Sequence, residues 1–247
     1  MKYKSIFISD IHLGTVSCKH NELLEFLKSL ESNFPENLYL VGDIIDIWKL
    51  GKGFVWKPEH NTVVQKILRM SRKGVNVHYV LGNHDEIFRS LPTGFKFGDI
   101  EVSDSVDYTT VDGRKFLVIH GDQYDNFLIQ NNLLAKIGSF AYDSLVVLNS
   151  ALSFLRRKLK MGYWSLSHYV KLRAKSATNV INTFETTMCD AIKQKGYSGV
   201  ICGHIHMANI LEKDKFTYIN CGDWTESCTA IAETYDGKFV ILKGPWQ

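Results

Sequence analysis

Five short clusters of histidine, aspartate and asparagine are spread along the 247-residue chain, and each follows a short apolar run. In chain order they are Asp10-Ile11-His12, Gly42-Asp43, Gly82-Asn83-His84-Asp85, His120-Gly121-Asp122 and Gly203-His204-Ile205-His206. Imidazole, carboxylate and amide oxygen are ligands of divalent metals, and this mixture suits manganese, iron or zinc better than calcium or magnesium. The clusters therefore predict a metal site assembled from distant parts of the chain.

Seven of these side chains are expected to hold two divalent ions. Two metals about 3.5–4 Å apart clamp a phosphoryl group and lower the pKa of a water between them. Such a pair needs a bridging carboxylate, and Asp43 is the candidate because it is the lone ligand of its loop. The other ligands divide into Asp10, His12 and His206 for one ion, and Asn83, His120 and His204 for the second.

His84 follows an expected ligand and is assigned to catalysis. It would donate a proton to a phosphate oxygen or to the leaving group, with Asp85 orienting the ring. Asp46 and Asp122 are interpreted as residues that support the ligands or cap turns. Other histidines, His20 and His60 among them, are expected to be surface or packed residues.

The elements that must position these residues follow from the apolar pattern. Strands are expected over Ser5–Ile8, Leu38–Val41, Val75–Leu81, Lys115–Ile119 and Gly199–Cys202. Apolar residues at helical spacing predict helices over Glu22–Leu30 and Asn61–Arg72. Alternating strands and helices indicate a largely parallel sheet, and ligands bind beyond the carboxyl ends of such strands. The clusters should therefore meet at one rim.

Two hairpins modify this picture. Asp112-Gly113 separates Val106–Val111 from Lys115–Ile119, and Asp236-Gly237 separates Cys228–Tyr235 from Lys238–Leu242. Asp-Gly between two β-prone runs is typical of a tight hairpin. With a further strand over Phe216–Ile219, the pattern predicts an α/β protein with two partly mixed sheets, packed face to face with helices outside.

Residues 125–196 have almost no strand pattern. We expect residues 1–124 and 197–247 to form the core and residues 125–196 to form a mostly helical insertion, or cap. Its last helix, Asn179–Lys195, would return to the core, with Asn179 at its start. The insertion is apolar and carries a basic cluster in which Arg156 and Arg157 could neutralise a second phosphate or anionic headgroups. A solvated basic face and ordinary helix packing are the alternatives.

Composition limits the partners and the compartment. A formal net charge of +3 is too small to indicate nucleic acid, and no long basic stripe with interleaved aromatic residues appears. Five cysteines without regular spacing indicate reduced thiols rather than a disulfide framework. No segment has the length of a signal peptide's apolar core or of a membrane-spanning helix. We expect a cytoplasmic protein, with peripheral contact to the inner face of the membrane left open.

The five motifs, in this order, resemble the signature of the calcineurin-like metallophosphoesterases. The resemblance implies a four-layer αββα sandwich with a dinuclear centre, often of manganese. It assigns the same roles to Asp10, His12, Asp43, Asn83, His84, His120, His204 and His206.

A narrower resemblance covers the whole chain. Residues 42–48, 120–125, 163–167 and 220–228 are similar to the bacterial UDP-2,3-diacylglucosamine diphosphatase branch of that family. Members of the branch cleave a pyrophosphate in lipid A biosynthesis, release UMP and a lipid 1-phosphate, and hold acyl chains under a helical cap. This resemblance implies a nucleotide-linked lipid substrate, bound in part through Asn83, Arg156 and Arg157.

Two other functions are kept as alternatives. Well-studied members of the branch carry arginine at the position of His84, so a soluble phosphodiester, dinucleoside polyphosphate or phosphoprotein is the second substrate class. The third reading is a metal-dependent scaffold for protein interactions. The complete set of expected ligands argues against it.

Overall fold

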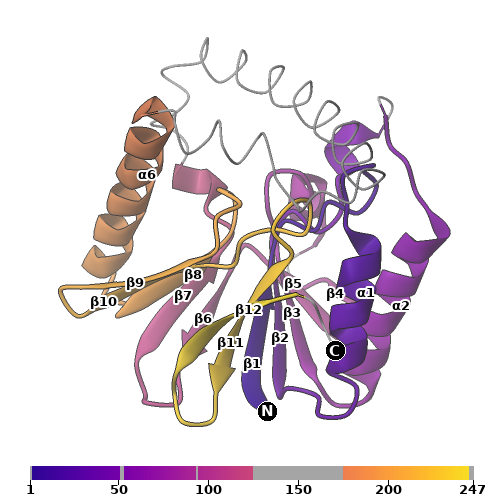
Figure 1. Cartoon of the computed structure of the whole chain (residues 1–247), viewed down its shortest axis with the longest axis horizontal. Coiled ribbons are helices and arrows are strands. Elements are labelled where there is room, and N and C mark those ends of the chain that lie inside the picture. The colour runs from indigo at the N-terminus through magenta and orange to yellow at the C-terminus, as the bar shows by residue number, and fades with distance from the viewer. Residues whose placement is uncertain (1, 51–52, 93, 125–174, 245–247) are drawn as a thin grey trace, which may run out of the picture. The chain divides into compact units, whose positions relative to one another are not determined.

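The computed structural model describes residues 2–50, 53–92, 94–124 and 175–244, with the backbone alone for residues 175–180. The chain divides into two compact units, Met1–Asp122 with Cys189–Gln247, and Gln123–Met188. The described strands all belong to the first unit and form two sheets (Figure 1).

The larger sheet has seven strands in the order β12-β11-β1-β2-β3-β5-β4. Its parallel centre is β1 (Tyr3–Ile8), β2 (Asn37–Val41), β3 (Asn76–Val80) and β5 (Ile100–Ser103). On one side β11 (Thr229–Thr234) pairs antiparallel with both β1 and β12 (Phe239–Lys243), and on the other β4 (Lys96–Phe97) pairs antiparallel with β5. The sheet is therefore mixed, with parallel strands in its middle.

The smaller sheet has five strands in the order β6-β7-β8-β10-β9. Its parallel strands are β7 (Lys115–Ile119), β8 (Gly199–Cys202) and β10 (Phe216–Asn220). The edges are β6 (Ser105–Thr109) and β9 (Asn209–Lys213), which pair antiparallel with β7 and β10. The expected two mixed sheets are confirmed.

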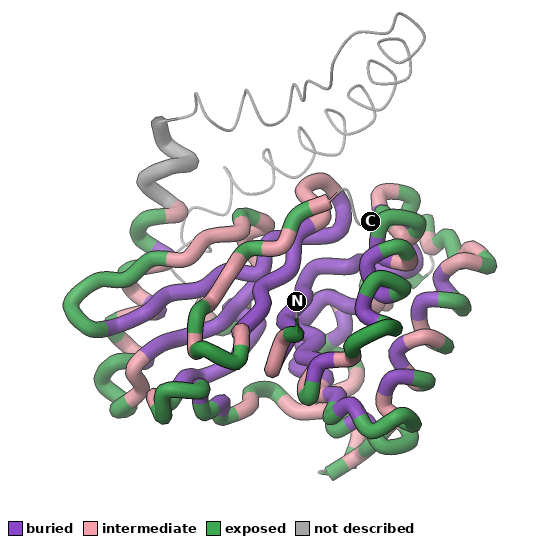
Figure 2. Tube along the Cα trace, turned by 60° about the horizontal axis from the view of Figure 1, so that its bottom comes forward, coloured by how far each residue is buried: buried purple, intermediate pink, exposed green. Residues whose placement is uncertain are grey.

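A mostly apolar layer joins the inner faces of the two sheets, and its buried polar groups include Ser5 and Glu233, which bond the Tyr108 hydroxyl. Phe7 of β1 stacks on Tyr39 of β2 with ring centroids 4.7 Å apart, and the edge of Tyr108 of β6 meets Phe7 at 5.1 Å. The central strands of both sheets are buried along most of their length, whereas the edge strands are largely exposed or half-buried (Figure 2). Because aromatic and β-branched side chains interdigitate across facing sheets, this layer fixes how the strand ends lie relative to each other.

Helices flank the sheets. On the seven-stranded sheet α1 (His20–Ser29) and α2 (Pro58–Arg72) bury one apolar stripe each, with Leu23, Phe26, Val63 and Ile67 in the same core cluster as Ile6. A third helix among the described residues is α6 (Lys175–Gln194), and short 3-10 turns are η1 (Ile47–Lys49), η2 (Glu86–Ser90) and η3 (Asp122–Tyr124). None of the described helices combines the length and apolarity needed to cross a bilayer.

The element boundaries differ from the expected ones for identifiable reasons. The helix expected from Asn61 begins at Pro58, where the fixed φ of proline suits a first helical position. The helix expected from Asn179 begins at Lys175, so Asn179 does not start it. Strand β9 was not expected, because its hairpin turn uses Asp214 and Lys215 at positive φ where glycine or asparagine would have indicated a turn.

Most of the expected cap lies outside the described residues, which contain only its last part, residues 175–196. Residues 125–174, which include Arg156 and Arg157, are not described. The cap and its basic cluster therefore stay predictions.

Candidate metal centre

The expected ligands all follow the carboxyl ends of parallel strands. Asp10 and His12 follow β1, Asp43 follows β2 and Asn83 follows β3, while His120, His204 and His206 follow β7 and β8 of the other sheet. Backbone hydrogen bonds join the loops: Asp10 N–H donates to Gly42 O over 3.1 Å, and Gly203 N–H donates to His120 O over 3.1 Å. The His204 amide donates to Asp10 Oδ2 over 2.9 Å, which connects the rims of the two sheets.

Six of the seven side chains form two groups that could each hold a metal ion. Asp10, His12 and His206 form one, and Asp43, His120 and His204 form the other; within each, the donor atoms lie within 4.8 Å of one another. Asp10 Oδ1 is 3.1 Å from His206 Nε2, and Asp43 Oδ2 is 3.4 Å from His120 Nε2. The first group consists of the three ligands expected for one ion, and the second contains His120 and His204 of the other expected set together with Asp43.

Asp43 lies between the two groups. Its Oδ2 is 3.4 Å from His120 Nε2 in one group and 3.9 Å from His12 Nε2 in the other. Its Oδ1 accepts a hydrogen bond from the His84 amide over 2.9 Å, which orients the carboxylate. This is the placement that a bridging ligand requires.

Four polar atoms of the expected ligands are buried without a hydrogen-bond partner. They are Asp10 Oδ1, His12 Nε2, Asn83 Oδ1 and His120 Nε2. Buried polar atoms are nearly always paired, and leaving one unpaired costs about 1–3 kcal/mol. Because these four carry lone pairs suited to a cation and come from three separate loops, after β1, β3 and β7, they fit divalent metal ions. Asn83 is not a member of either three-residue group, but its buried Oδ1 without a hydrogen-bond partner is consistent with its expected role as a ligand.

In three of the expected histidine ligands, the ring nitrogen Nδ1 lies near an oxygen atom outside the metal centre. His12 Nδ1 lies 3.3 Å from Asp46 Oδ2, His120 Nδ1 lies 3.1 Å from the Val41 carbonyl oxygen, and His206 Nδ1 lies 3.5 Å from Asp223 Oδ2. An N–H donated from Nδ1 fixes the tautomer and leaves the Nε2 lone pair facing the centre. Asp46 and Asp223 therefore support the ligands, and Asp223 also caps the backbone amides of residues 225–227.

The loops that carry the ligands have an unusual backbone. Asp10, His12, Asp43, His204 and His206 all have positive φ, between 52° and 70°. For residues with a side chain this conformation is uncommon and costs of order 1–3 kcal/mol each, and such strain gathers at functional sites. No residue type in the sequence indicated it.

Two glycines allow the loops to approach so closely. A Cβ on Gly82 would lie 2.2 Å from Asp43 Oδ1 and 2.8 Å from His120 Cδ2. A Cβ on Gly42 would lie 2.2 Å from His120 Nδ1. Both positions therefore exclude any larger residue, as expected of glycines that precede ligands.

The carboxylates make the centre strongly attractive to positive charge. Burial alone lowers the pKa of His120, but the charges of Asp43 and Asp10 outweigh it and raise that pKa to about 10. Burial raises the pKa of Asp43, but His120 and His12 hold it well below its usual range. Without a metal, a proton is the cation that this site retains, so metal and proton compete for the same nitrogen.

His84 lies beside the centre, with a different partner from the expected one. Its Nδ1 donates to Asp46 Oδ1 over 3.0 Å, and its Nε2 lies 3.8 Å from Asp43 Oδ2. Burial lowers the pKa of His84, but the hydrogen bond to Asp46 and the charge of Asp43 raise it above the ordinary value. The ring can therefore act as a proton donor near neutral pH.

The expectation that Asp85 orients His84 is wrong in its geometry. The Asp85 carboxylate is fully buried and accepts hydrogen bonds from Gly82 N–H at 2.6 Å, Ile44 N–H at 2.9 Å and Tyr79 O–H at 2.7 Å. It therefore holds two ligand loops together. Sequence proximity suggested Asp85, whereas the fold brings Asp46 from the neighbouring loop to the His84 ring.

Known proteins are similar to this chain over most of its length. A protein from Neisseria meningitidis serogroup C named UDP-2,3-diacylglucosamine hydrolase is 30% identical over 260 residues, covering 96% of this chain and 95% of its own length. A protein of the same name from Histophilus somni (strain 2336) is 25% identical over 250 residues, covering 95% and 97%. A solved structure of a hypothetical protein from Pyrococcus horikoshii OT3 shares the fold, with TM-score 0.51 and 10% identity over all of this chain and 89% of that one.

The family model described as calcineurin-like phosphoesterase matches residues 3–208, which include every ligand-bearing loop. The chain belongs to the calcineurin-like phosphoesterase family and is a hydrolase of phosphoric esters.

Proposed function

We propose that this chain hydrolyses the pyrophosphate bond of UDP-2,3-diacylglucosamine and releases UMP and the lipid 1-phosphate. The similarity to proteins named for that substrate runs over nearly the full length of both chains. The observation that supports the chemistry most strongly is the set of four buried ligand atoms without a hydrogen-bond partner, which come from three loops. The lipid substrate rests on the relatives, and the hydrolysis rests on the site.

The proposed site residues divide into ligands and a proton donor. Asp10, His12 and His206 would hold one ion, Asn83, His120 and His204 the other, and Asp43 both. When bound, two divalent ions polarise the phosphoryl oxygens and supply a water of lowered pKa. We propose manganese, because a mixed nitrogen and oxygen ligand set without thiolate suits it; iron and zinc suit the same set.

His84 would supply the proton in this reaction. The hydrogen bond from its Nδ1 to Asp46 places the proton-bearing Nε2 toward Asp43 and the centre. From there the ring can donate to the phosphoryl oxygen or to the departing phosphate oxygen. Asp46 orients the ring, and Asp85 acts on the backbone that carries it.

Exposed apolar residues near the centre support a substrate with an apolar part. Val16 follows the β1 ligands, Trp48 and Leu50 follow Asp43, and Ile87 follows His84, and each is between 57% and 73% exposed. Trp48 also contacts the His84 ring edge-to-face at 5.0 Å. Large apolar side chains gathered on the loops around a polar site are typical of a ligand surface. A soluble phosphodiester substrate would not need them.

The deciding experiment is product analysis with manganese present. We expect UMP and a lipid 1-phosphate from UDP-2,3-diacylglucosamine, and much weaker hydrolysis of cyclic nucleotides and dinucleoside polyphosphates. Faster hydrolysis of a soluble substrate would replace the lipid proposal. No hydrolysis of bis-p-nitrophenyl phosphate with manganese, cobalt or zinc would favour a scaffold.

The remaining proposals concern the cap and the compartment. We propose that Arg156 and Arg157 contact a phosphate of the substrate or anionic headgroups, and that the protein works in the cytoplasm on the inner face of the membrane. Replacing both arginines with alanine should weaken binding to anionic vesicles or raise KM for the lipid. Unchanged values of both would remove the proposal.

A further inference from the structure

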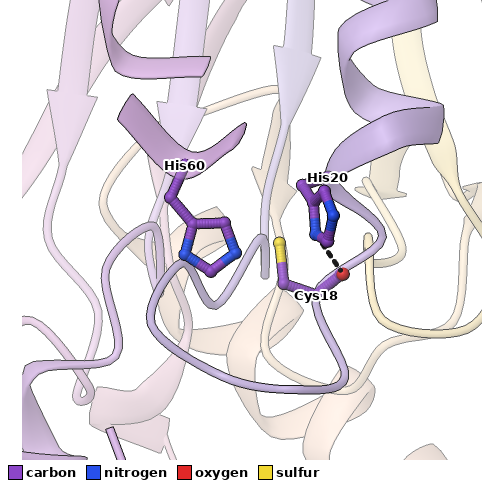
Figure 3. Close-up of side chains that lie close together, drawn as sticks. All are labelled: Cys18, His20 and His60. Carbon is purple, nitrogen blue, oxygen red and sulfur yellow. Dashed lines mark hydrogen bonds between the residues drawn. The ribbon is translucent and has the colours of Figure 1, made fainter. Parts of the chain in front are cut away.

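A second group of potential metal ligands lies apart from the dinuclear centre. Cys18 precedes α1, His20 is the first residue of α1, and His60 is in the first turn of α2. One donor atom from each residue lies within 4.8 Å of the others. The side chains point toward one another, with the Cys18 sulfur between the two rings (Figure 3). The expectation that His20 and His60 are unrelated surface or packed residues does not account for this convergence.

The environment of His60 is unusual for a histidine that only packs. The residue is fully buried, and its Nε2 has no hydrogen-bond partner. Cys18 is 3% exposed. Trp56 meets the His60 ring edge-to-face at 5.3 Å and shields it further. A buried, unpaired ring nitrogen beside a thiol is the observation that indicates a ligand.

His20 keeps one ring nitrogen that can serve as a metal ligand. Its Nδ1 lies 3.1 Å from the Cys18 carbonyl oxygen, so this nitrogen must carry the proton. The Nε2 of the same ring then keeps its lone pair. Histidines that bind metals commonly donate their other N–H to a backbone carbonyl in this way.

We propose that Cys18, His20 and His60 bind one zinc ion. A thiolate with two imidazoles suits zinc, and three protein ligands leave a fourth tetrahedral position for water. Zinc–ligand bonds are about 2.0–2.3 Å long, so the donors need to approach each other by about 1 Å. The expected ligands of the dinuclear centre include no cysteine, so the two sites differ in chemistry.

Binding requires a defined movement of protons. The Gly14 amide donates to His60 Nδ1 over 3.2 Å, which places the ring proton on Nε2. Zinc needs the Nε2 lone pair, so this proton moves to Nδ1 and the Gly14 amide turns away. The Cys18 thiol loses its proton, because the thiolate is the ligand. One proton is therefore released for each zinc ion bound.

Such a site would join two segments near the catalytic loops. It connects the segment after His12 with the start of α2, and Gly14 O of that segment already accepts a hydrogen bond from Val55 N–H, just before α2. The proposed role is to fix the loop that continues from Asp10 and His12. This inference does not depend on the substrate or on the phosphoesterase reaction.

The test is a titration of the full-length protein with cobalt(II) in a non-thiol reductant. Cobalt bound to a thiolate gives an intense near-ultraviolet charge-transfer band that histidine and carboxylate ligands do not give. We expect the band in the wild type, its loss in Cys18→Ser, and binding at least about tenfold weaker in His20→Gln. Cys228→Ser is the matched control and should keep the band. Added zinc should displace the cobalt and abolish the band.

His20→Gln keeps the test decisive if Cys18→Ser fails to fold, because His20 is only partly buried. Elemental analysis after loading with zinc should find one metal ion more per chain in the wild type than in His20→Gln. No band in the reduced wild type, or a band that persists in folded Cys18→Ser, would overturn the proposal. Hydrolytic activity plays no part in either measurement.

Discussion

Replacing Asp46 with asparagine should show how much the orientation of the His12 and His84 rings contributes to activity while every expected metal ligand is kept. The Asp46 carboxylate is 1% exposed and accepts from two rings, His12 at 3.3 Å and His84 at 3.0 Å. One ring is an expected metal ligand and the other is the proposed proton donor. Asparagine keeps the size of the side chain and removes its charge, so both rings lose a charged acceptor.

The expected effect can be worked out from these two contacts. Loss of an outer partner of a metal-bound histidine lowers affinity or activity about 10–100-fold. At about 1.4 kcal/mol for each factor of ten, this is about 1.4–2.8 kcal/mol. Because Asp46 serves both rings, we expect the upper end, a loss of about 100-fold in kcat/KM with a higher manganese requirement.

The pH profile provides the second readout. The hydrogen bond to Asp46 contributes to the raised pKa of His84, although burial opposes it. If His84 acts in its protonated form, activity falls as the pH rises through this pKa. Asp46→Asn lowers the pKa, so the alkaline limb should move to lower pH, by about one unit for each 1.4 kcal/mol lost.

The assay is manganese-dependent hydrolysis of bis-p-nitrophenyl phosphate across a range of pH and metal concentration. Asp104→Asn is the matched control, since that exposed carboxylate pairs with Arg89 and contacts no expected ligand. A folded Asp46→Asn protein with wild-type kcat/KM and an unmoved alkaline limb would refute the role given to Asp46.

Three further predictions follow from the same contacts. Gly82→Ala should abolish metal binding and lower activity more than 100-fold, because the added Cβ would overlap the Asp43 side chain. Gly196→Ala is the control: no atom lies within 4 Å of a Cβ added there, so the free energy of unfolding should fall by about 1 kcal/mol and activity should be retained. Trp48→Ala should raise KM for the lipid substrate at least fivefold and leave bis-p-nitrophenyl phosphate hydrolysis within twofold; equal losses on both substrates would count against an apolar contact. The metal-free protein should lose stability as the pH rises from about 6.5 toward 10. The pKa of His120 is about 10 in the folded state and about 6.5 in the unfolded state, so the protonated ring stabilises the folded state, and this contribution is lost as the pH rises through that range. Thermal unfolding across this range measures the loss, and manganese should suppress the trend.

The strands and the ligand clusters could be predicted from the sequence because each cluster of potential metal ligands follows an apolar run. The parallel strands and the clusters after them were predictable because apolar runs end at polar residues in a fixed order. The bridging role expected of Asp43 also came from its position in the sequence, and in the structure its Oδ2 lies within 4 Å of His12 and of His120. These features depend on neighbours along the chain, which a sequence shows directly.

Contacts between distant loops were not predictable in the same way. Asp46 and Asp85 both sit near His84, and only the fold shows that Asp46 reaches its ring while Asp85 binds Gly82 and Ile44. The positive φ of the ligands left no mark in the residue types, because strain there depends on the surrounding loops. The approach of His60 to Cys18 was equally hidden, since it depends on how α2 packs.

The most direct test of the metal centre is anomalous diffraction from a crystal grown with manganese. Two peaks about 3.5–4 Å apart are expected, one beside Asp10, His12 and His206 and one beside Asn83, His120 and His204, with Asp43 touching both. A manganese-saturated crystal with no peak among these seven residues, or with one peak that Asp43 does not contact, would contradict the account.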